Sequence, residues 1–214
     1  MSGLPCVVHL PDSRVLPPFG ARPAILFLHG IGECGGGDGR QLEVGLGPAL
    51  KQGAAAGSVV LFPQKPKGGE WEDHVEAIDA LLAQATLEHG VDPEKITLTG
   101  LSHGGHGCWA LAVHRPGKWA RIVVVCGYLE RWAPLDSPLC RLPKLLGPLS
   151  KELPKAVGTT PVEIFHNTLD PAIHVEESRA AARILREAGA SVVLTELDGP
   201  GHNSWDEAYR RAFG

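Results

Sequence analysis

Residues 95–109 restrict the fold more than any other stretch of the chain, because three local signals follow one another there without a break. Residues 96–99 are a β-branched run typical of a buried strand. Residues 100–104 have the form Gly-x-Ser-x-Gly, and the apolar stretch 108–114, which ends before Pro116, indicates a helix. A serine at such a junction projects its hydroxyl from a strained turn, and the N–H groups of the helix N-terminus face the same place.

The five-residue pattern alone is also consistent with an ordinary turn, since Gly and Ser are common turn residues. The composition narrows the choice of protein class. With 214 residues, 43% hydrophobic and 21% charged, the chain is typical of a globular protein with a sizeable core, and we expect a single domain over residues 1–214. The net charge of −4 without an obvious basic face argues against a nucleic-acid partner.

The cysteine spacings and the lengths of the apolar runs indicate the cellular compartment. The five cysteines have irregular spacings and include no Cys-x-x-Cys pair, which favours reduced thiols in a cytoplasmic protein over a disulfide framework. The N-terminal residues show no basic region followed by a long apolar run, so we expect no signal peptide. No stretch approaches the roughly 20 apolar residues of a membrane span. The sequence leaves the oligomeric state open.

Strand and helix patterns alternate along the chain. The expected buried strands lie at 24–28, 58–62, 96–99, 121–127, 162–166 and 191–196, and the main expected helices at 72–89, 108–114, 174–188 and 204–212. This alternation predicts a mostly parallel central sheet with helices on both faces. Val7 and Val8 are candidates for an edge strand, and residues 42–56 for a short, interrupted helix. The proline-rich segment 128–160 has two possible interpretations. It is either part of a rim or lid over the site or an inert surface connection.

A serine nucleophile needs a base beside it and an acid that holds the base. Asp170 follows the expected strand 162–166, and His202 follows the expected strand 191–196. In α/β-hydrolases the three groups occur in the order Ser, acid, His, each after a strand, and the carboxyl ends of parallel strands share one sheet edge. The sequence therefore predicts a catalytic triad of Ser102, His202 and Asp170.

Other residues compete for these roles. Asp136, after the strand that begins at residue 121, is the main alternative acid, whereas Asp198 is too close to His202 in the chain to orient it easily. We expect His166 to support the Asp170 loop and His29 to bond to backbone. Because His29, His103 and His106 show no His-x-x-x-His spacing and a serine nucleophile needs no metal, we expect neither a metal nor a cofactor.

The glycine-rich residues 29–39 follow the apolar run 24–28 and lack the Gly-Lys-Ser/Thr ending of a phosphate-binding loop. In a serine hydrolase of this design, such a loop supplies the second N–H group of an oxyanion hole. We expect the N–H groups of Ile31 and His103 in that role, and a flexible surface loop is the alternative. Gly30, Glu33 and Trp71 are the candidate substrate contacts.

Several stretches resemble a family of compact esterases. The stretches that carry the likeness are Leu-His-Gly-Ile-Gly-Glu (28–33), Phe-Pro-Gln (62–64), 95–110, 165–170, 177–178 and 201–206, so it covers nearly the whole chain. They are similar to compact α/β-hydrolases of the predicted peptidase or phospholipase/carboxylesterase type, which are related to dienelactone hydrolases, acyl-protein thioesterases and feruloyl esterases. The resemblance implies a minimal α/β-hydrolase core without a large cap domain, together with the triad and the oxyanion donors named above.

Two positions depart from that family, which leaves the substrate preference open. His103 stands where relatives usually have Met or Gln, and Cys34 stands where they usually have Arg. The backbone donors survive both changes. Our hypothesis is hydrolysis of small or short-acyl carboxylic esters, as small-molecule substrates, through an acyl-enzyme. The alternatives are a thioesterase or peptidase, an acyltransferase on the same machinery, and a non-catalytic binding protein on a hydrolase fold.

Overall fold

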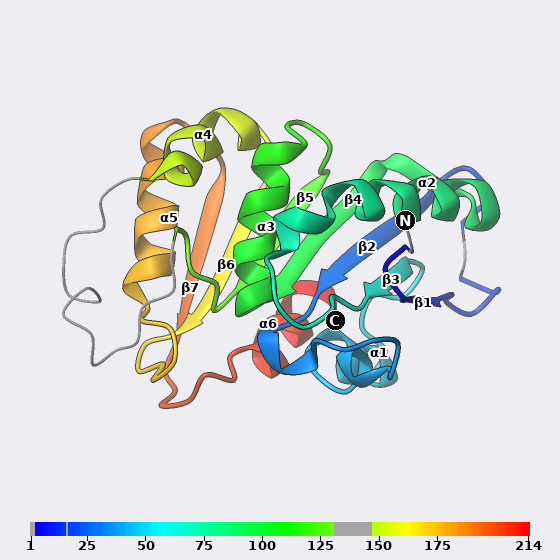
Figure 1. Cartoon of the computed structure of the whole chain (residues 1–214), viewed down its shortest axis with the longest axis horizontal. Coiled ribbons are helices and arrows are strands. Elements are labelled where there is room, and N and C mark those ends of the chain that lie inside the picture. The colour runs from blue at the N-terminus through cyan, green and yellow to red at the C-terminus, as the bar shows by residue number, and fades with distance from the viewer. Residues whose placement is uncertain (1–2, 16, 131–146) are drawn as a thin grey trace.

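One seven-stranded sheet forms the centre of the computed structural model, which describes residues 3–15, 17–130 and 147–214 (Figure 1). The strand order is β1-β3-β2-β4-β5-β6-β7, and only β1 pairs antiparallel to its neighbour. The strands are β1 (Cys6–His9), β2 (Arg22–Leu28), β3 (Val59–Pro63), β4 (Val91–Leu101), β5 (Arg121–Val125), β6 (Val162–Asn167) and β7 (Val192–Leu197). The edge strand expected around Val7 and Val8 is therefore present.

Helices cover both faces of this sheet. They are α1 (Leu46–Lys51), α2 (Val75–His89), α3 (His103–His114), α4 (Pro148–Val157), α5 (Glu176–Glu187) and α6 (Trp205–Phe213), with single 3-10 turns η1 (Ile31–Glu33), η2 (Arg40–Leu42) and η3 (Trp71–His74). The helices α2 to α5 pack on one face, and α1 and α6 pack on the other (Figure 1). The predicted fold class, a mostly parallel sheet between helical layers, is confirmed.

The strand β2 shows why an unbroken apolar run forms the centre of this sheet. Side chains alternate between the two faces of a strand. Leu26 and Leu28 accordingly pack in the core under α2 to α5, whereas Ile25 and Phe27 pack in the core under α1 and α6. All four are at most 3% exposed, and burial of each such side chain stabilises the fold by about 1.5–3 kcal/mol. A polar residue at any of these positions would leave one helical layer without its apolar partner.

Two elements extend beyond the sequence patterns. The strand β4 starts at Val91 rather than at 96, and its register against β2 shifts between Arg22 and Ala24. This irregularity accommodates Pro93, which cannot donate to the sheet ladder. The helix α3 starts at His103, although glycines and histidines in its first turns are poor helix formers. Because every residue from 103 to 112 is buried, tertiary packing stabilises this part of the helix.

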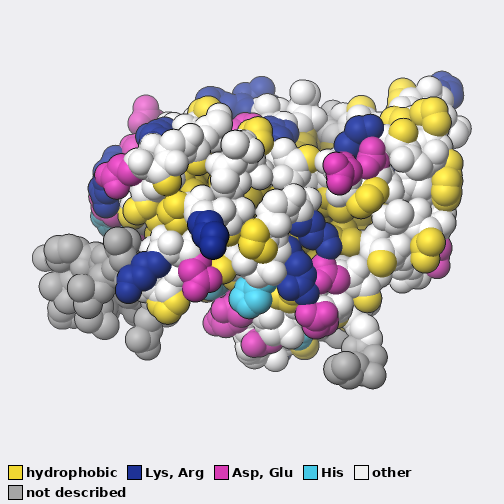
Figure 2. Space-filling model, turned by 90° about the horizontal axis from the view of Figure 1, so that it is seen from above, with side chains coloured by type: hydrophobic (Ala, Val, Ile, Leu, Met, Phe, Trp, Pro, Cys, Tyr) yellow, Lys and Arg dark blue, Asp and Glu magenta, His cyan; other side chains and the backbone are white. Residues whose placement is uncertain are grey.

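On the face drawn in Figure 2, Lys and Arg side chains lie interspersed with Asp and Glu, so this face has no large patch of one charge. Over the ranges that the structure describes, no helix combines the length and apolarity needed to cross a membrane. Cys6, Cys34, Cys108 and Cys126 are free thiols. The segment 128–160 contains α4, but its residues 131–146, with the alternative acid Asp136, lie outside the described residues.

Candidate active site

Ser102 lies in the sharp turn between β4 and α3, with φ 55° and ψ −118°. A positive φ is costly for a residue with a side chain, so the surrounding packing must impose it. The two glycines of the motif permit that packing. A Cβ on Gly100 would lie 2.3 Å from the carbonyl oxygen of Gly104, and a Cβ on Gly104 would lie 2.0 Å from that of Leu28. Only glycine at both positions lets β4, α3 and β2 approach this closely.

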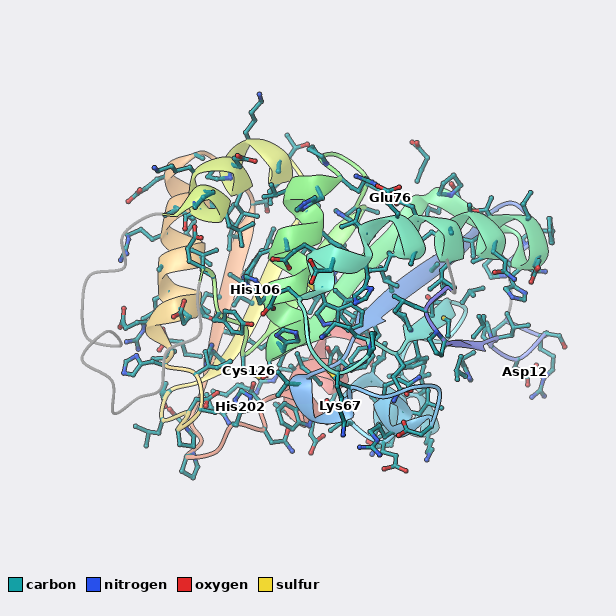
Figure 3. The ribbon with its side chains drawn as sticks, viewed as in Figure 1. Asp12, Lys67, Glu76, His106, Cys126 and His202 are labelled. Atoms are coloured by element: carbon teal, nitrogen blue, oxygen red, sulfur yellow. The ribbon has the colours of Figure 1, made fainter. Side chains whose placement is uncertain are left out.

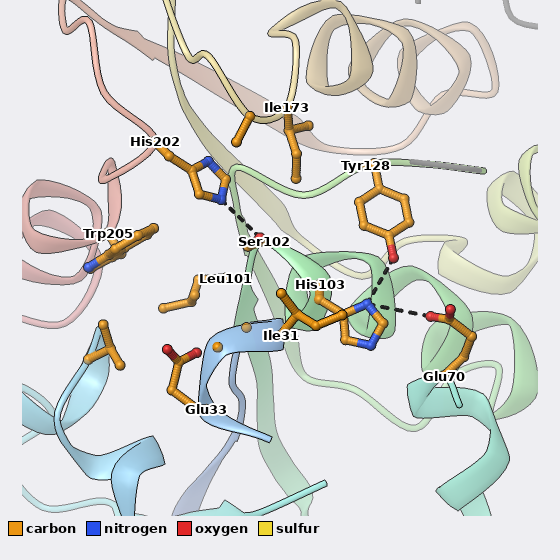
Figure 4. Close-up of a pocket in the computed structure, with 14 residues that line it drawn as sticks. Ile31, Glu33, Glu70, Leu101, Ser102, His103, Tyr128, Ile173, His202 and Trp205 are labelled. Carbon is orange, nitrogen blue, oxygen red and sulfur yellow. Dashed lines mark hydrogen bonds and ion pairs between the residues drawn. The ribbon is translucent and has the colours of Figure 1, made fainter. Parts of the chain in front are cut away.

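Three loops bring the predicted triad together at the carboxyl edge of the sheet. Ser102 follows β4, Asp170 follows β6 and His202 follows β7. The Ser102 Oγ lies 2.9 Å from the His202 Nε2, and the His202 Nδ1 lies 2.7 Å from the Asp170 Oδ2 (the first contact is drawn in Figure 4). Both distances lie in the range of good hydrogen bonds. The arrangement allows His202 to accept the serine proton while Asp170 holds the ring.

Asp170 is fixed by four groups. Its Oδ1 accepts the backbone N–H of Ala172 at 2.8 Å and of Ile173 at 3.0 Å. Its Oδ2 accepts from His202 and lies 3.3 Å from the His166 Nε2. Burial raises the pKa of the Asp170 carboxyl, but these hydrogen bonds lower it by more, so the group is a carboxylate at neutral pH. His166 lies where the sequence placed it, beside the Asp170 loop.

A cysteine that the sequence analysis did not single out lies beside His202. The Cys126 Sγ, an Asp170 oxygen and a His202 ring nitrogen lie within 4.8 Å of one another. Figure 3 labels Cys126 and His202. Burial lowers the pKa of His202, while Asp170 and Cys126 raise it, and the balance is a pKa above the usual histidine range. The signal for Cys126 was its position directly after β5, at the same sheet edge as the triad.

The raised pKa of His202 predicts the pH dependence of any reaction at Ser102. His202 must be neutral to accept the serine proton, so activity appears only as the pH rises through the pKa of this ring. We expect the acid limb of kcat/KM for an uncharged ester to lie above the ordinary histidine value of 6.5. The pH dependence of Ser102 labelling by a fluorophosphonate should follow the same limb. A limb centred below about pH 6 would contradict the assignment of the base.

The two expected oxyanion donors, Ile31 and His103, belong to separate elements. Ile31 is the first residue of η1, and His103 is the first residue of α3. The first N–H groups of a helix have no acceptor within the helix, so both remain available to an oxyanion. Both residues line the pocket above Ser102. The geometry is consistent with the oxyanion hole expected from the sequence.

His29 holds the loop that carries Ile31. The backbone N–H of Lys65 donates to the His29 Nε2 at 2.9 Å, so the proton of the ring is on Nδ1, which donates to the carbonyl of Gly30 at 2.6 Å. Burial lowers the pKa of His29 to about 4, which keeps the ring neutral. The backbone bonding expected for His29 is therefore present, and it sets the direction of the peptide that precedes Ile31.

A pocket of about 430 Å³ opens over Ser102 (Figure 4). Its lining residues are Gly30, Ile31, Gly32, Glu33, Val44, Glu70, Leu101, Ser102, His103, Tyr128, Ala172, Ile173, His202 and Trp205. Gly30 and Glu33 thus lie where the sequence predicted substrate contacts. A Cβ on Gly30 would lie 3.0 Å from the Glu33 Oε2 and 3.7 Å from the Ser102 Cβ, so glycine keeps this part of the pocket open.

The expectation that Trp71 contacts the substrate is wrong. Its side chain is 0% exposed and is absent from the pocket lining. The indole packs against the His29 ring, donates to the His29 carbonyl at 3.3 Å, and fills the space that a Cβ on Gly107 would need. The neighbouring residue Glu70 lines the pocket instead, because Trp71 turns inward at the start of η3.

One wall of the pocket consists of residues that the sequence analysis did not assign. The His103 Nδ1 lies 2.9 Å from the Tyr128 hydroxyl and 3.4 Å from a Glu70 oxygen (Figure 4). The Tyr128 ring stacks on His106 with a centroid separation of 4.4 Å. Burial lowers the pKa of His103 to about 4, so its side chain is neutral. His103, the unusual residue after Ser102, is therefore a neutral side chain in this wall, between the Tyr128 hydroxyl and the Glu70 carboxylate.

In the described residues, two groups of side chains lie close enough together to hold a metal ion. One is Cys126, Asp170 and His202, in which the Asp170–His202 hydrogen bond already joins two members. The other combines His106 with the carboxylates of Glu70 and Glu72, of which the first is exposed. Neither set has the four Cys or His ligands typical of a structural zinc site.

No protein-family model matches the chain. Acyl-protein thioesterase 1 of Gibberella zeae is 27% identical over 126 residues, which is 59% of this chain and 48% of that protein, so the match spans about half of the relative's length. This relative confirms the resemblance to acyl-protein thioesterases that the motifs indicated.

Several solved esterases share the fold. A thermostable esterase has a TM-score of 0.71 and 23% identity, over 95% of this chain and 55% of its own. Esterase PE8 has a TM-score of 0.69 and 19% identity, over 99% of this chain and 96% of its own. A thermophilic esterase of Thermogutta terrifontis with bound butyrate has a TM-score of 0.67 and 20% identity, over 97% and 86%. The α/β-hydrolase fold predicted from the sequence is thereby confirmed.

Proposed function

We propose that this chain is a serine hydrolase that cleaves carboxylic esters through an acyl-enzyme, with residues 1–214 as one catalytic domain. The observation that carries the proposal is the continuous hydrogen-bonded series from Ser102 through His202 to the buried Asp170, with Ser102 in the lining of an open pocket. A serine, a base and an orienting acid at these distances form the arrangement that activates a hydroxyl. The esterase and thioesterase relatives support the same reaction class.

The geometry suggests the order of steps. His202 Nε2 takes the proton of Ser102 as Oγ attacks the carbonyl carbon, and the N–H groups of Ile31 and His103 stabilise the oxyanion. The imidazolium, held by Asp170, then gives its proton to the leaving alcohol as the ester C–O bond breaks. Water attacks the acyl-enzyme with His202 again as the base, which releases the acid and restores Ser102. Each oxyanion donor in such a site lowers the barrier by about 3–4 kcal/mol.

The pocket supports small or short-acyl esters. A volume of about 430 Å³ is near the lower end of typical ligand sites, and its apolar lining includes Leu101, Ile173 and Val44. The Thermogutta terrifontis esterase, a structural neighbour, holds butyrate in one structure and propionate in another. These observations favour acyl chains of two to a few carbons.

A chain-length series tests this proposal. We expect p-nitrophenyl acetate and butyrate to have a kcat/KM about tenfold or more above that of p-nitrophenyl octanoate, because a short acyl group fits the pocket. Rates for the three esters at one pH above the acid limb, each corrected for spontaneous hydrolysis, give the comparison. Absence of turnover and of fluorophosphonate labelling in the folded protein would favour a non-catalytic binding protein. A preference for octanoate would contradict the size assignment alone.

The relative from Gibberella zeae specifically favours thioesters as a second candidate substrate class. The same nucleophile and oxyanion donors accept a thioester carbonyl, and a thiolate leaves without needing full protonation. Matched S-phenyl and O-phenyl butyrates, assayed against their spontaneous rates, distinguish the two classes. An ester product formed in the presence of added methanol would instead identify an acyltransferase.

A further inference from the structure

The charges in the catalytic pocket are of one sign. Among the lining residues, which all belong to the described part of the chain, the only charged groups besides histidines are the carboxylates of Glu33 and Glu70, and none is Lys or Arg. His103 is neutral, as its pKa of about 4 requires. When His202 is neutral, as it must be to accept the serine proton, a substrate that enters this pocket meets two carboxylates and no positive charge from the lining side chains.

Glu33 lies on the side of Ser102 that also holds an aromatic ring and apolar groups. Figure 4 shows its carboxylate on the same side of the pocket as Trp205, close to Leu101, whereas Glu70 lies on the opposite side with Tyr128. Glu33 is half-buried and forms no ion pair with Lys or Arg in the described ranges. A carboxylate, an indole and apolar surface are the groups that recognise an organic cation.

The acidic character continues outside the pocket. A second hollow shares Gly32, Glu33 and Val44 with the pocket, and its further lining residues are Asp38, Arg40 and Glu43. Arg40 lies 2.8 Å from Asp38, so this pair is internally neutralised. Glu33 and Glu43 remain as the net charge of the hollow. A long-range negative potential at the entrance would raise the local concentration of cationic substrates.

The buried ammonium group of Lys65 is held by backbone carbonyl oxygens. Lys65 is 0% exposed, and its Nζ donates to the carbonyl oxygens of Pro66 at 3.2 Å, Gly68 at 2.8 Å and Gly69 at 2.8 Å. Its charge acts on the Glu70 side of the pocket, where it lowers the carboxyl pKa that burial raises. On the other side, burial raises the pKa of the Glu33 carboxyl, and two backbone N–H groups and the charge of Arg40 lower it only in part, so a cation beside Glu33 would still be stabilised.

We propose that the pocket selects esters that carry a positively charged group, a quaternary ammonium or a protonated amine, which binds beside Glu33 and Trp205. This inference rests on the proposed ester hydrolysis and names its substrate class. The charge can lie in the alcohol part or in the acyl part of the ester, since both parts lie within the pocket during the reaction. Anionic esters are disfavoured by the same two carboxylates.

Pairs of isosteric esters that differ only in charge test the proposal. For the alcohol part the pair is butyrylcholine and 3,3-dimethylbutyl butyrate, followed by acid release in a pH-stat. For the acyl part the pair is the p-nitrophenyl esters of 4-(trimethylammonio)butyric acid and 5,5-dimethylhexanoic acid. In at least one pair we expect kcat/KM for the cationic ester to be about tenfold or more above that of its neutral isostere, the scale of one partly buried cation contact.

Glu33→Gln is the diagnostic variant, and Glu94→Gln is its matched control. Glu94 is exposed near the start of β4, at the sheet edge opposite Ser102, so its removal changes the net charge equally without altering the pocket. We expect Glu33→Gln to lower the cationic-to-neutral ratio about tenfold and Glu94→Gln to leave it unchanged. If Glu33→Gln does not fold, the wild-type ratio should still fall between about 20 mM and about 500 mM NaCl.

The outcomes separate this inference from the proposed function. Equal kcat/KM values for both members of both pairs, with the neutral esters hydrolysed, would overturn the cation preference and leave the esterase assignment intact. A ratio that Glu94→Gln lowers as much as Glu33→Gln would also overturn it. No hydrolysis of any of the four esters by the folded protein would count against the proposed function itself.

Discussion

Ser102→Ala is expected to lower kcat for p-nitrophenyl butyrate by about 10⁶-fold, the scale seen when a triad nucleophile is removed. The variant loses the Ser102 Oγ, which lies 2.9 Å from the His202 Nε2, so no acyl-enzyme forms at this position. Oxyanion stabilisation and substrate binding survive, which leaves a small residual rate over water. Initial rates with a large excess of enzyme, compared with buffer alone, measure this residual rate.

The control for this variant must separate a lost nucleophile from a lost fold. Alanine suits the positive φ of Ser102 no worse than serine does, so we expect the midpoint of thermal unfolding to change little. Ser58→Ala is the matched variant, because Ser58 lies before β3 at the opposite end of the sheet. A fluorophosphonate should label the wild type and Ser58→Ala but not Ser102→Ala. Labelling that persists in Ser102→Ala would assign the nucleophile elsewhere.

The meeting of Ser102, His202 and Asp170 could be predicted because each residue is defined by its place in the chain. Each follows a strand whose apolar run is visible in the sequence, and a parallel sheet brings the ends of such strands to one edge. The same rule also places Cys126 and Tyr128 at this edge, after β5. The rule did not reveal that the Cys126 thiol contacts His202 or that Tyr128 contacts His103, because side-chain direction in a loop depends on backbone angles that no pattern encodes. Cys126, for example, has φ 40°.

Trp71 and Glu70 show that residue type alone does not predict which side chain lines a pocket. A tryptophan in a loop near an active site suggests an aromatic contact with substrate, but the pocket contains the preceding glutamate instead. A shift of one residue at the start of a helical turn reverses which side chain faces the interior. The capping interactions of Glu70 and Asp73 fix that register, and they follow from the local sequence only once the turn is known.

Helix α3 shows the opposite case, in which a weak local signal hid the first residues of a helix that the fold requires. Residues 103–107 contain three glycines and two histidines, so propensity placed the helix start at 108. The close approach of Gly104 to β2 and of Gly105 to Gly127 needs residues without side chains. The sequence feature that lowers helix propensity is therefore the one that lets the helix lie against the strands and direct its N-terminus at Ser102.

Asp170→Asn is expected to lower kcat by about 10⁴-fold while the fold is retained. The Oδ1 of Asp170 accepts two backbone N–H groups, from Ala172 and Ile173, and the side-chain oxygen of Asn would keep these bonds. Its amide N–H₂ would then face the His202 Nδ1. A donor at that position requires an unprotonated Nδ1, so the ring proton moves to Nε2, which can no longer accept the proton of Ser102.

The pH profile distinguishes this effect from simple loss of structure. Loss of the carboxylate removes the contact with Asp170 that raises the pKa of His202, so the acid limb of the residual kcat/KM should move to lower pH. Asp198→Asn is the matched control, since Asp198 is exposed and lies on the loop that carries His202. Its rate and its acid limb should equal those of the wild type. If Asp170→Asn kept more than about a tenth of the wild-type kcat, the acid would have to be another residue, because a triad acid that holds the tautomer of its histidine is not dispensable to that degree.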